Sequence, residues 1–351
     1  MPMEISAEWS REPGPRVEAS RDLDASKVQA PGIIERPGGG FRLFYTAVGP
    51  GRPYPECQGY ILSAVSDDGL DFTPEPGIRL APRPDVAHMS LRLLAPSIVQ
   101  LTDGRFRMYV EARGTSDRPT VITSALSENQ LEWQHEEGVR LVTPDGLGGP
   151  RLVDLPDGRC RLLACADDFG AGGRAGGQRS GKHIVSAVSD DGLDFVLEPG
   201  ERIRSGQGTW DALGITAGQL LAPSEPSAAW TMIYSAWQDA PAGSHIPLHP
   251  SDPSTADTPP EELDFAAASI AADISGFRSR IFRSRSRSVD GLSFGPPECI
   301  VAGGGYDSDD IDAVHAEDMS VISLGDGRLR MYYAACDAAG NWRIASAVTD
   351  S

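Results

Sequence analysis

Basic residues are scarce in this chain, in which 31 lysines and arginines stand against 50 aspartates and glutamates and the formal net charge is −19. A nucleic-acid partner needs a basic surface to neutralise its phosphates. An anionic membrane surface also selects basic residues. We therefore expect neither nucleic acid nor a membrane as a partner, and a small molecule instead. Oligomeric state leaves no mark in the sequence.

Long apolar runs are also missing, because none approaches the ~20 residues that a membrane-spanning helix needs. Residues 1–8 contain no basic segment followed by an apolar stretch, so a secretory signal is not expected. Together with the few cysteines, this composition favours a reducing cytoplasm as the location.

Cysteine is rare, and its pattern is not that of a metal site. The five cysteines are odd in number and lack metal-finger spacing. Three of them, Cys160, Cys165 and Cys336, lie in strand-like segments. We expect these three to act as small core residues.

A regular amphipathic helix pattern is absent from the repeated part of the chain, where a short motif recurs. Ser-Asp-Asp-Gly-Leu-Asp-Phe stands at residues 66–72 and 189–195, with weaker copies at 127–133 and 288–294 and a truncated one at 348–351. From lead Ser or Thr to the next, the steps are 61, 62, 99 and 61 residues. Such a step indicates a repeated supersecondary unit.

A second motif precedes each copy and predicts a hairpin. Asp-Gly-Arg followed by alternating apolar and polar residues stands at 103–109, 157–163 and 326–332, and residues 40–45 and 230–234 occupy the same place. Asp-Gly before such alternation is a hairpin signal. Each unit is therefore predicted to contain four antiparallel strands.

These units predict an all-β fold, a single five-bladed β-propeller over residues 1–351 with four antiparallel strands per blade. The blades are expected at about 25–82, 89–144, 146–205, 211–303 and 311–351. The last unit stops after its third strand. Because residues 6–19 resemble the missing outer strand, we expect the N-terminal strand to close the last blade and cover its edge.

The one long step places an insertion in the fourth unit, at residues 239–276. Its first part is rich in Pro, Ser and Asp and predicts a loop. The capping box at 258–261, with Pro at the first helical position, predicts a helix over 263–271. With the glycine-rich segment 170–179, the insertion is expected to cover part of a central pocket.

The two motifs resemble those of the five-bladed propellers of glycoside hydrolase families 43, 32, 62 and 68. The Ser-x-Asp-Gly turns are also similar to the Asp-box hairpins of sialidases, so Asp68 and Asp191 are expected only to form turns. The resemblance implies three acidic residues at the starts of the inner strands, two of which act as general acid and as nucleophile or base.

We call the equivalent position in this chain the slot; it precedes the strand-opening proline or its counterpart. The slot residues of the five units are Ala30, Ala95, Gly149, Ala217 and Asp318. Because Asp318 alone is acidic, the chain departs from the pattern of those families, and an ordinary glycosidase mechanism is not assured by the motifs.

Residues that break the repeat are the better candidates for function. At the end of the second strand the equivalent residues are Thr46, Glu111, Cys165, Ser235 and Ala334. Glu111 is the exception, and it is the predicted general acid, with Asp318 or Glu317 as its partner and His315 assisting. The predicted substrate-binding residues are Lys27, Gln29, Arg92, Arg113, Asp167, Asp168, His183, Trp237, Gln238 and Asp337.

The acidic stretch before the fifth inner strand, residues 307–318, leaves three interpretations open: a solvated loop, a Ca²⁺ or other hard-cation site, and a catalytic carboxylate. His88, His183 and His315 come from separate units and could bind a transition metal. No cofactor is required by either pattern.

Three functions follow from these patterns. The leading one is a glycosidase-like enzyme that acts on a small glycosidic or polyol-like substrate by carboxylate acid–base chemistry. The alternatives are a non-hydrolytic enzyme of specialised metabolism built on the same scaffold and a sugar-binding module without catalysis.

Overall fold

The structure is a computed structural model, and the part of the chain that it describes comprises residues 8–25, 27–49, 58–115, 118–144, 146–166, 183–211, 214–223, 228–239, 277–305 and 308–350. In these ranges the regular structure is β-strand, apart from one short 3-10 helix, η2 (Ala87–Met89). The all-β prediction is confirmed. None of the described segments is a helix long and apolar enough to cross a membrane.

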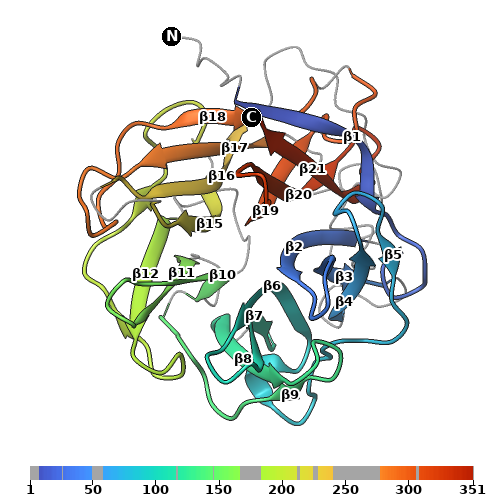
Figure 1. Cartoon of the computed structure of the whole chain (residues 1–351), viewed down its shortest axis with the longest axis vertical. Coiled ribbons are helices and arrows are strands. Elements are labelled where there is room, and N and C mark those ends of the chain that lie inside the picture. Colours follow the sequence, from blue (N-terminus) through green and yellow to red (C-terminus); the bar gives the residue numbers. More distant parts are fainter. Residues whose placement is uncertain are drawn as a thin grey trace, which may run out of the picture.

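Antiparallel meanders follow one another along the chain and surround a common centre (Figure 1). The first contains β2 (Lys27–Glu35), β3 (Phe41–Val48), β4 (Gly59–Ser66) and β5 (Thr73–Pro74). The next contains β6 (Arg92–Gln100), β7 (Phe106–Arg113), β8 (Val121–Ser127) and β9 (Gln134–His135). One parallel bridge, Gly59 to Arg92, joins these two into an eight-stranded sheet.

Two further sheets come next. One contains β10 (Leu147–Asp154), β11 (Cys160–Ala166), β12 (His183–Ser189), β13 (Val196–Leu197) and β14 (Ile203–Arg204). The other contains β15 (Gly214–Leu221), β16 (Thr231–Asp239), β17 (Phe277–Arg285) and β18 (Glu298–Val301). The strands nearest the centre in Figure 1 are β2, β6, β10, β15 and β19.

The last sheet joins the two ends of the chain. It orders β19 (His315–Ser323), β20 (Leu329–Cys336) and β21 (Trp342–Thr349) next to β1 (Trp9–Val17), which pairs antiparallel with β21 (Figure 1). Glu12 of β1 accepts hydrogen bonds from Arg330 at 3.0 Å and from Ser346 at 2.7 Å. The predicted pairing of the N-terminal strand with the last unit is confirmed.

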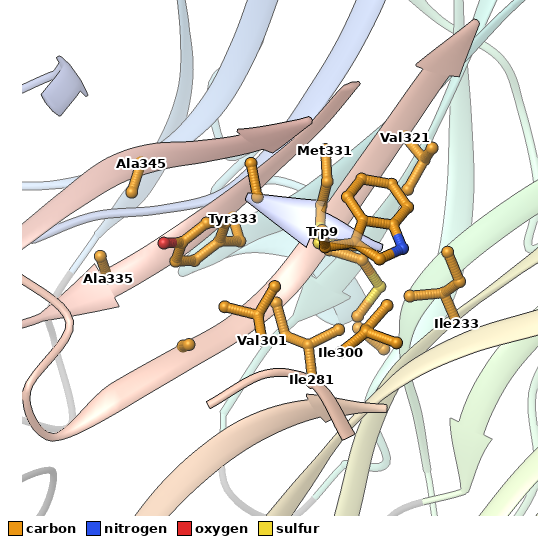
Figure 2. Close-up of a cluster of buried hydrophobic side chains, with 14 residues drawn as sticks. Trp9, Ile233, Ile281, Ile300, Val301, Val321, Met331, Tyr333, Ala335 and Ala345 are labelled. Carbon is orange, nitrogen blue, oxygen red and sulfur yellow. The ribbon is translucent and has the colours of Figure 1, made fainter. Parts of the chain in front are cut away.

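A hydrophobic cluster fixes β1 in this place. The Trp9 side chain is buried among residues of the last two sheets, including Ile233, Ile300 and Met331 (Figure 2). Because burial of a large aromatic side chain removes much apolar area from water, this contact anchors the closing strand.

The Ser-x-Asp-Gly motifs are turns, as predicted. Oδ1 of Asp191 accepts hydrogen bonds from the backbone N–H groups of Leu193 at 2.8 Å and Asp194 at 3.0 Å. Gly192 has φ of 71°, which a glycine adopts without strain. The N–H groups of Asp194 and Leu193, followed by the Ser189 hydroxyl, lower the pKa of Asp191 to about 2. Asp68 is held in the same way.

The two repeated motifs bind each other across neighbouring repeat units. An arginine of the hairpin motif pairs in its own unit with a glutamate that lies in the outer strand or directly after it; the pairs are Arg42–Glu75, Arg107–Glu136, Arg161–Glu198 and Arg330–Glu12. The same arginines donate to carbonyl groups in an adjacent turn, those of Asn129, Asp191, Asp290 and Asp68 respectively. The motifs are therefore structural.

The three cysteines lie in β11 and β20, and the prediction that they are core residues is confirmed for Cys165 and Cys336. Cys165 and Cys336 are buried and Cys160 is half-buried. The glycine-rich segment 170–179, the insertion beyond residue 239, and Asp167, Asp168 and Asp307 lie outside the described residues.

Candidate functional site

The slot residues share one unusual backbone conformation. Their φ values are positive in every case: Ala30 48°, Ala95 52°, Gly149 57°, Ala217 43° and Asp318 53°. Each lies at a register shift between its inner strand and the second strand of the sheet. Left-handed backbone is uncommon for residues other than glycine, and the surroundings must impose it. The equivalence inferred from the sequence is thus reproduced by the backbone.

Side chains of the preceding repeat unit hold the slots in place. The N–H of Ala95 donates to Oγ1 of Thr46 at 2.8 Å, and the N–H of Asp318 donates to Oγ of Ser235 at 3.0 Å. The N–H of Gly149 donates to Oε2 of Glu111 at 3.0 Å. In these units the residue at the end of the second strand therefore accepts the slot N–H of the next unit, and Glu111 does so with a longer, charged side chain.

Glu111 is buried, with 6% of its surface exposed, and both its oxygens are bonded. Oε1 accepts a hydrogen bond of 2.5 Å from Nε of Arg113, which lies two residues further along β7. Gly148 makes room for the carboxylate, because a Cβ atom there would lie 2.5 Å from Oε2. Glu111, predicted as the general acid, and Arg113, predicted separately as substrate-binding, are thus brought together on one face of the sheet.

Asp318 is partly exposed, unlike Glu111, and the carbonyl of the next residue, Met319, is bound by the buried Arg151. Its negative charge acts on the guanidinium of Arg151 in β10. Arg151 also donates hydrogen bonds to the carbonyl groups of Met319 and Pro150, the residues that follow the slots Asp318 and Gly149. Glu111 binds the slot residue Gly149, and Asp318 is a slot residue itself. The same guanidinium therefore links the two slots.

Glu317 precedes the slot and contacts the neighbouring sheet. Its Oε2 accepts a hydrogen bond of 2.8 Å from the indole N–H of Trp237 in β16. Trp237 is partly exposed, so this bond fixes the orientation of an accessible aromatic ring. The two residues were predicted separately, as catalytic and as substrate-binding, and the structure places them in direct contact.

His315 is buried and belongs to an aromatic group at the start of β19. Its Nδ1 lies 3.0 Å from Oγ of Ser279, and its ring stacks on Trp342 with centroids 5.3 Å apart. Nζ of Lys27 lies 5.1 Å from the centroid of the Trp342 ring, in cation–π geometry. The exposed fraction of His315 is 1%, so in this structure the imidazole is packed between protein groups.

Four other predicted residues are placed as follows. Asp337 accepts hydrogen bonds from Asn341 and Arg343 within its own hairpin. Burial acts to raise the pKa of Asp337, but the hydrogen bonds from Asn341 and Arg343 outweigh it and the pKa is lowered. Arg92 is buried opposite Arg113 in the β6–β7 pair. Gln29 lies opposite Thr46, and Gln238 opposite Arg278.

The predicted group of three histidine ligands is not formed. His183 lies near Glu201, with 3.9 Å between Nε2 and Oε1, whereas His315 contacts Ser279. Burial lowers the pKa of His88, which lies in η2. Among the residues that the structure describes, no three His, Cys, Asp or Glu side chains are grouped to hold a metal ion. The sequence predicted that these histidines share one face of the molecule, but in the structure their side chains are not grouped.

The acidic stretch before β19 is tied to the N-terminal strand. Asp312 is buried and accepts hydrogen bonds from Arg11 at 2.7 Å and from the Tyr333 hydroxyl at 2.8 Å. Asp24 stands three residues before β2 and is likewise buried, with the Tyr45 hydroxyl 3.2 Å away. These two aspartates stabilise loops, and sequence comparison missed their equivalence because the surrounding residues differ.

No protein-family model matches the chain, and no curated protein matches it in sequence. Solved structures do match. One is a family-43 glycoside hydrolase, a thermostable protein, at 15% identity and a TM-score of 0.61, covering 91% of this chain and 88% of that one. The chain has the fold of the glycosidase-like propeller proteins.

Two further structures cover more of the chain. A GH130 protein, from a study of hydrolases that target β-1,2 mannosidic linkages in Candida mannan, has 12% identity and a TM-score of 0.67 and covers 96% of this chain and 93% of its own. A protein of Parabacteroides distasonis, provisionally classed as a glycoside hydrolase, has 11% identity and a TM-score of 0.69, with coverages of 98% and 97%.

Proposed function

We propose that this chain is a five-bladed propeller enzyme that acts on a small glycosidic or polyol-like substrate at the slots around its centre. The neighbouring structures are glycoside hydrolases or phosphorylases, which supports the class of substrate. At such low identity the similarity extends to the fold alone, so the chemistry must be argued from the residues of this chain.

The observation that supports the proposal best is the contrast among the slots. Four of them contain alanine or glycine, while Asp318 has a carboxylate on a backbone fixed by Ser235. Rigid backbone around a polar group is the arrangement that a catalytic group requires. Glu111, bonded to the slot of Gly149, supplies the second carboxylate that glycoside cleavage needs.

The roles follow from the surroundings of each carboxylate. Asp318, next to the charge of Arg151, is suited to be the base or nucleophile. Glu111 would serve as the general acid. Arg113 is hydrogen-bonded to the Glu111 carboxylate, so substrate must displace Arg113 before Glu111 can donate a proton. Trp237, held by Glu317, offers an aromatic surface for a sugar ring.

A panel of aryl glycosides, assayed for released phenol with and without inorganic phosphate, tests this proposal. We expect activity on at least one substrate, and a loss of at least about 100-fold in Asp318→Asn and in Glu111→Thr. Glu111→Thr is a matched variant, because Thr46 shows that threonine holds a slot equally well. Full activity in either variant would refute the assignment of that residue.

A second candidate function is sugar binding without cleavage. It is favoured by the engagement of both glutamates with protein groups, Glu111 with Arg113 and Glu317 with Trp237. In that case the protein cleaves none of the aryl glycosides, while a sugar raises its melting temperature. Trp237→Ala should abolish this increase, and Glu111→Thr should retain it.

A further inference from the structure

Arg151 occupies the centre of the molecule, and its side chain uses every donor that it has. The guanidinium donates two hydrogen bonds to the carbonyl of Met319, at 3.1 and 3.2 Å, and one to that of Pro31, at 2.9 Å. It donates two more to the carbonyls of Pro96, at 3.3 Å, and Pro150, at 3.0 Å. An arginine has five N–H groups. None is left for a ligand, so Arg151 does not contact substrate.

The four carbonyl groups have a common position in the repeat. Pro31, Pro96, Pro150 and Met319 each follow a slot residue directly. One side chain thus joins the inner strands β2, β6, β10 and β19 at the point where their backbone is left-handed. Since unpaired buried carbonyls would each carry a desolvation cost, the guanidinium stabilises this conformation in four strands at once.

The guanidinium also places a fixed positive charge inside the protein. Burial lowers the pKa of Arg151 to about 10, and the negative charge of Asp318 opposes this shift. Arg151 therefore stays protonated at neutral pH. A cation that cannot move away favours the ionised form of a neighbouring carboxyl.

We propose that Arg151 is the positioning residue of the candidate site, which fixes the slot of Asp318 and keeps the Asp318 carboxyl ionised. This assigns Asp318 the part of base or nucleophile and leaves the proton-donating part to another group. The inference deepens the proposed function and rests on it for the catalytic meaning, but the coupling between the two residues can be measured without any substrate.

The first experiment measures that coupling by urea unfolding of wild type, Asp318→Asn, Arg151→Met and the double variant, between pH 3 and pH 8. Asparagine tolerates left-handed backbone as aspartate does, so Asp318→Asn removes charge alone. At pH 7 we expect Asp318→Asn to be less stable than wild type, and the difference to shrink progressively as the pH falls below about 4. The same substitution should not destabilise Arg151→Met. Equal effects in both backgrounds would overturn the proposal.

Arg151→Met leaves four carbonyls unpaired and can fail to fold. In that event wild type and Asp318→Asn decide the question alone. A stability difference that shrinks as the pH falls supports the coupling, and a difference independent of pH contradicts it. Arg151→Lys, which retains the charge but loses most of the hydrogen bonds, should keep the wild-type pH dependence with a lower melting temperature.

The second experiment uses the pH profile of kcat/KM on any aryl glycoside that wild type cleaves. Loss of the cation in Arg151→Met should move the acidic limb upward by about one pH unit. Arg161→Met, a buried arginine remote from the slots, is the control that lowers stability without moving the limb. An unmoved limb in Arg151→Met refutes the inference. Absence of cleavage by wild type refutes the proposed function, while the unfolding experiment still decides the coupling.

Discussion

Glu111 accepts the backbone N–H of Gly149 at 3.0 Å, in the place where Thr46 accepts that of Ala95. The carboxylate thus replaces a hydroxyl in a structural bond of the repeat. Its extra reach brings the second oxygen to Arg113. Glu111 therefore keeps the hydrogen bond that the repeat requires and makes a second one with Arg113. We expect substitutions around its carboxylate to affect activity.

Gly148→Ala tests whether the Glu111 carboxylate must keep its position. The new Cβ atom would lie 2.5 Å from Oε2, and Gly148 has ordinary backbone that alanine can adopt. Because the side chain of Glu111 must move, we expect any glycosidase activity to fall at least about 10-fold, with a loss of unfolding free energy of about 1 kcal/mol. Gly325→Ala, with open space at its Cβ, is the control for the assay. Equal activity of both variants would contradict this account.

Truncation of the N-terminal strand tests closure of the last sheet. Removal of residues 1–19 deletes Trp9 and Glu12, and leaves Arg330 without its carboxylate and β21 without its outer neighbour. We expect no cooperative thermal transition by circular dichroism. Trp9→Ala alone should reduce the unfolding free energy by about 3 kcal/mol. A truncated protein that melts at the wild-type temperature would show that β1 is dispensable.

Arg161→Met tests the bond between neighbouring sheets. It removes hydrogen bonds of 2.8 and 2.9 Å to Glu198 and one of 2.7 Å to the carbonyl of Asp290. Since the nearly buried carboxylate of Glu198 loses its partner, we expect the unfolding free energy measured by chemical denaturation to fall by about 3 kcal/mol. Arg159→Met removes an exposed ion pair with Asp157, which solvent screens, and should leave the unfolding free energy almost unchanged. Similar losses in the two variants would refute a special role for the inter-sheet arginine.

Asp191 should make the stability of its turn dependent on pH. Its pKa is about 2 in the folded protein, below the value of about 3.9 in an unfolded chain. A lowered folded pKa stabilises the protein above the unfolded pKa, and this contribution disappears as the pH falls from about 4 to about 2. The unfolding free energies of wild type and Asp191→Asn should therefore converge over this range. A constant difference would contradict the assigned hydrogen bonds, and Asp190→Asn serves as the exposed control.

The sequence predicted much of the fold because the relevant signals are local. The turn at Asp191 depends on N–H groups two and three residues away, and the hairpin at Asp157 on the same kind of contact. Such contacts repeat wherever the residues repeat. Comparison of the units also located the slots correctly, since Ala30, Ala95 and Asp318 occupy the same place relative to their strands.

The site was predicted less completely. Glu111, Arg113, Glu317 and Trp237 were found because they break the repeat, but the contact between Glu317 and Trp237 crosses 80 residues of sequence and has no local signal. The histidines were wrongly expected to approach one another, since a shared face of the molecule does not decide where side chains point.

The amino-acid sequence by itself determined the strands, the turns, the pairing of a strand within residues 6–19 with the last unit and the position of each slot. Only the tertiary structure decided what occupies the centre. Arg151 looks ordinary in the sequence, because its significance lies in carbonyl groups 55, 120 and 168 residues away. Backbone carbonyls have no sequence signature, and it takes the convergence of four inner strands to make them a binding site for one guanidinium.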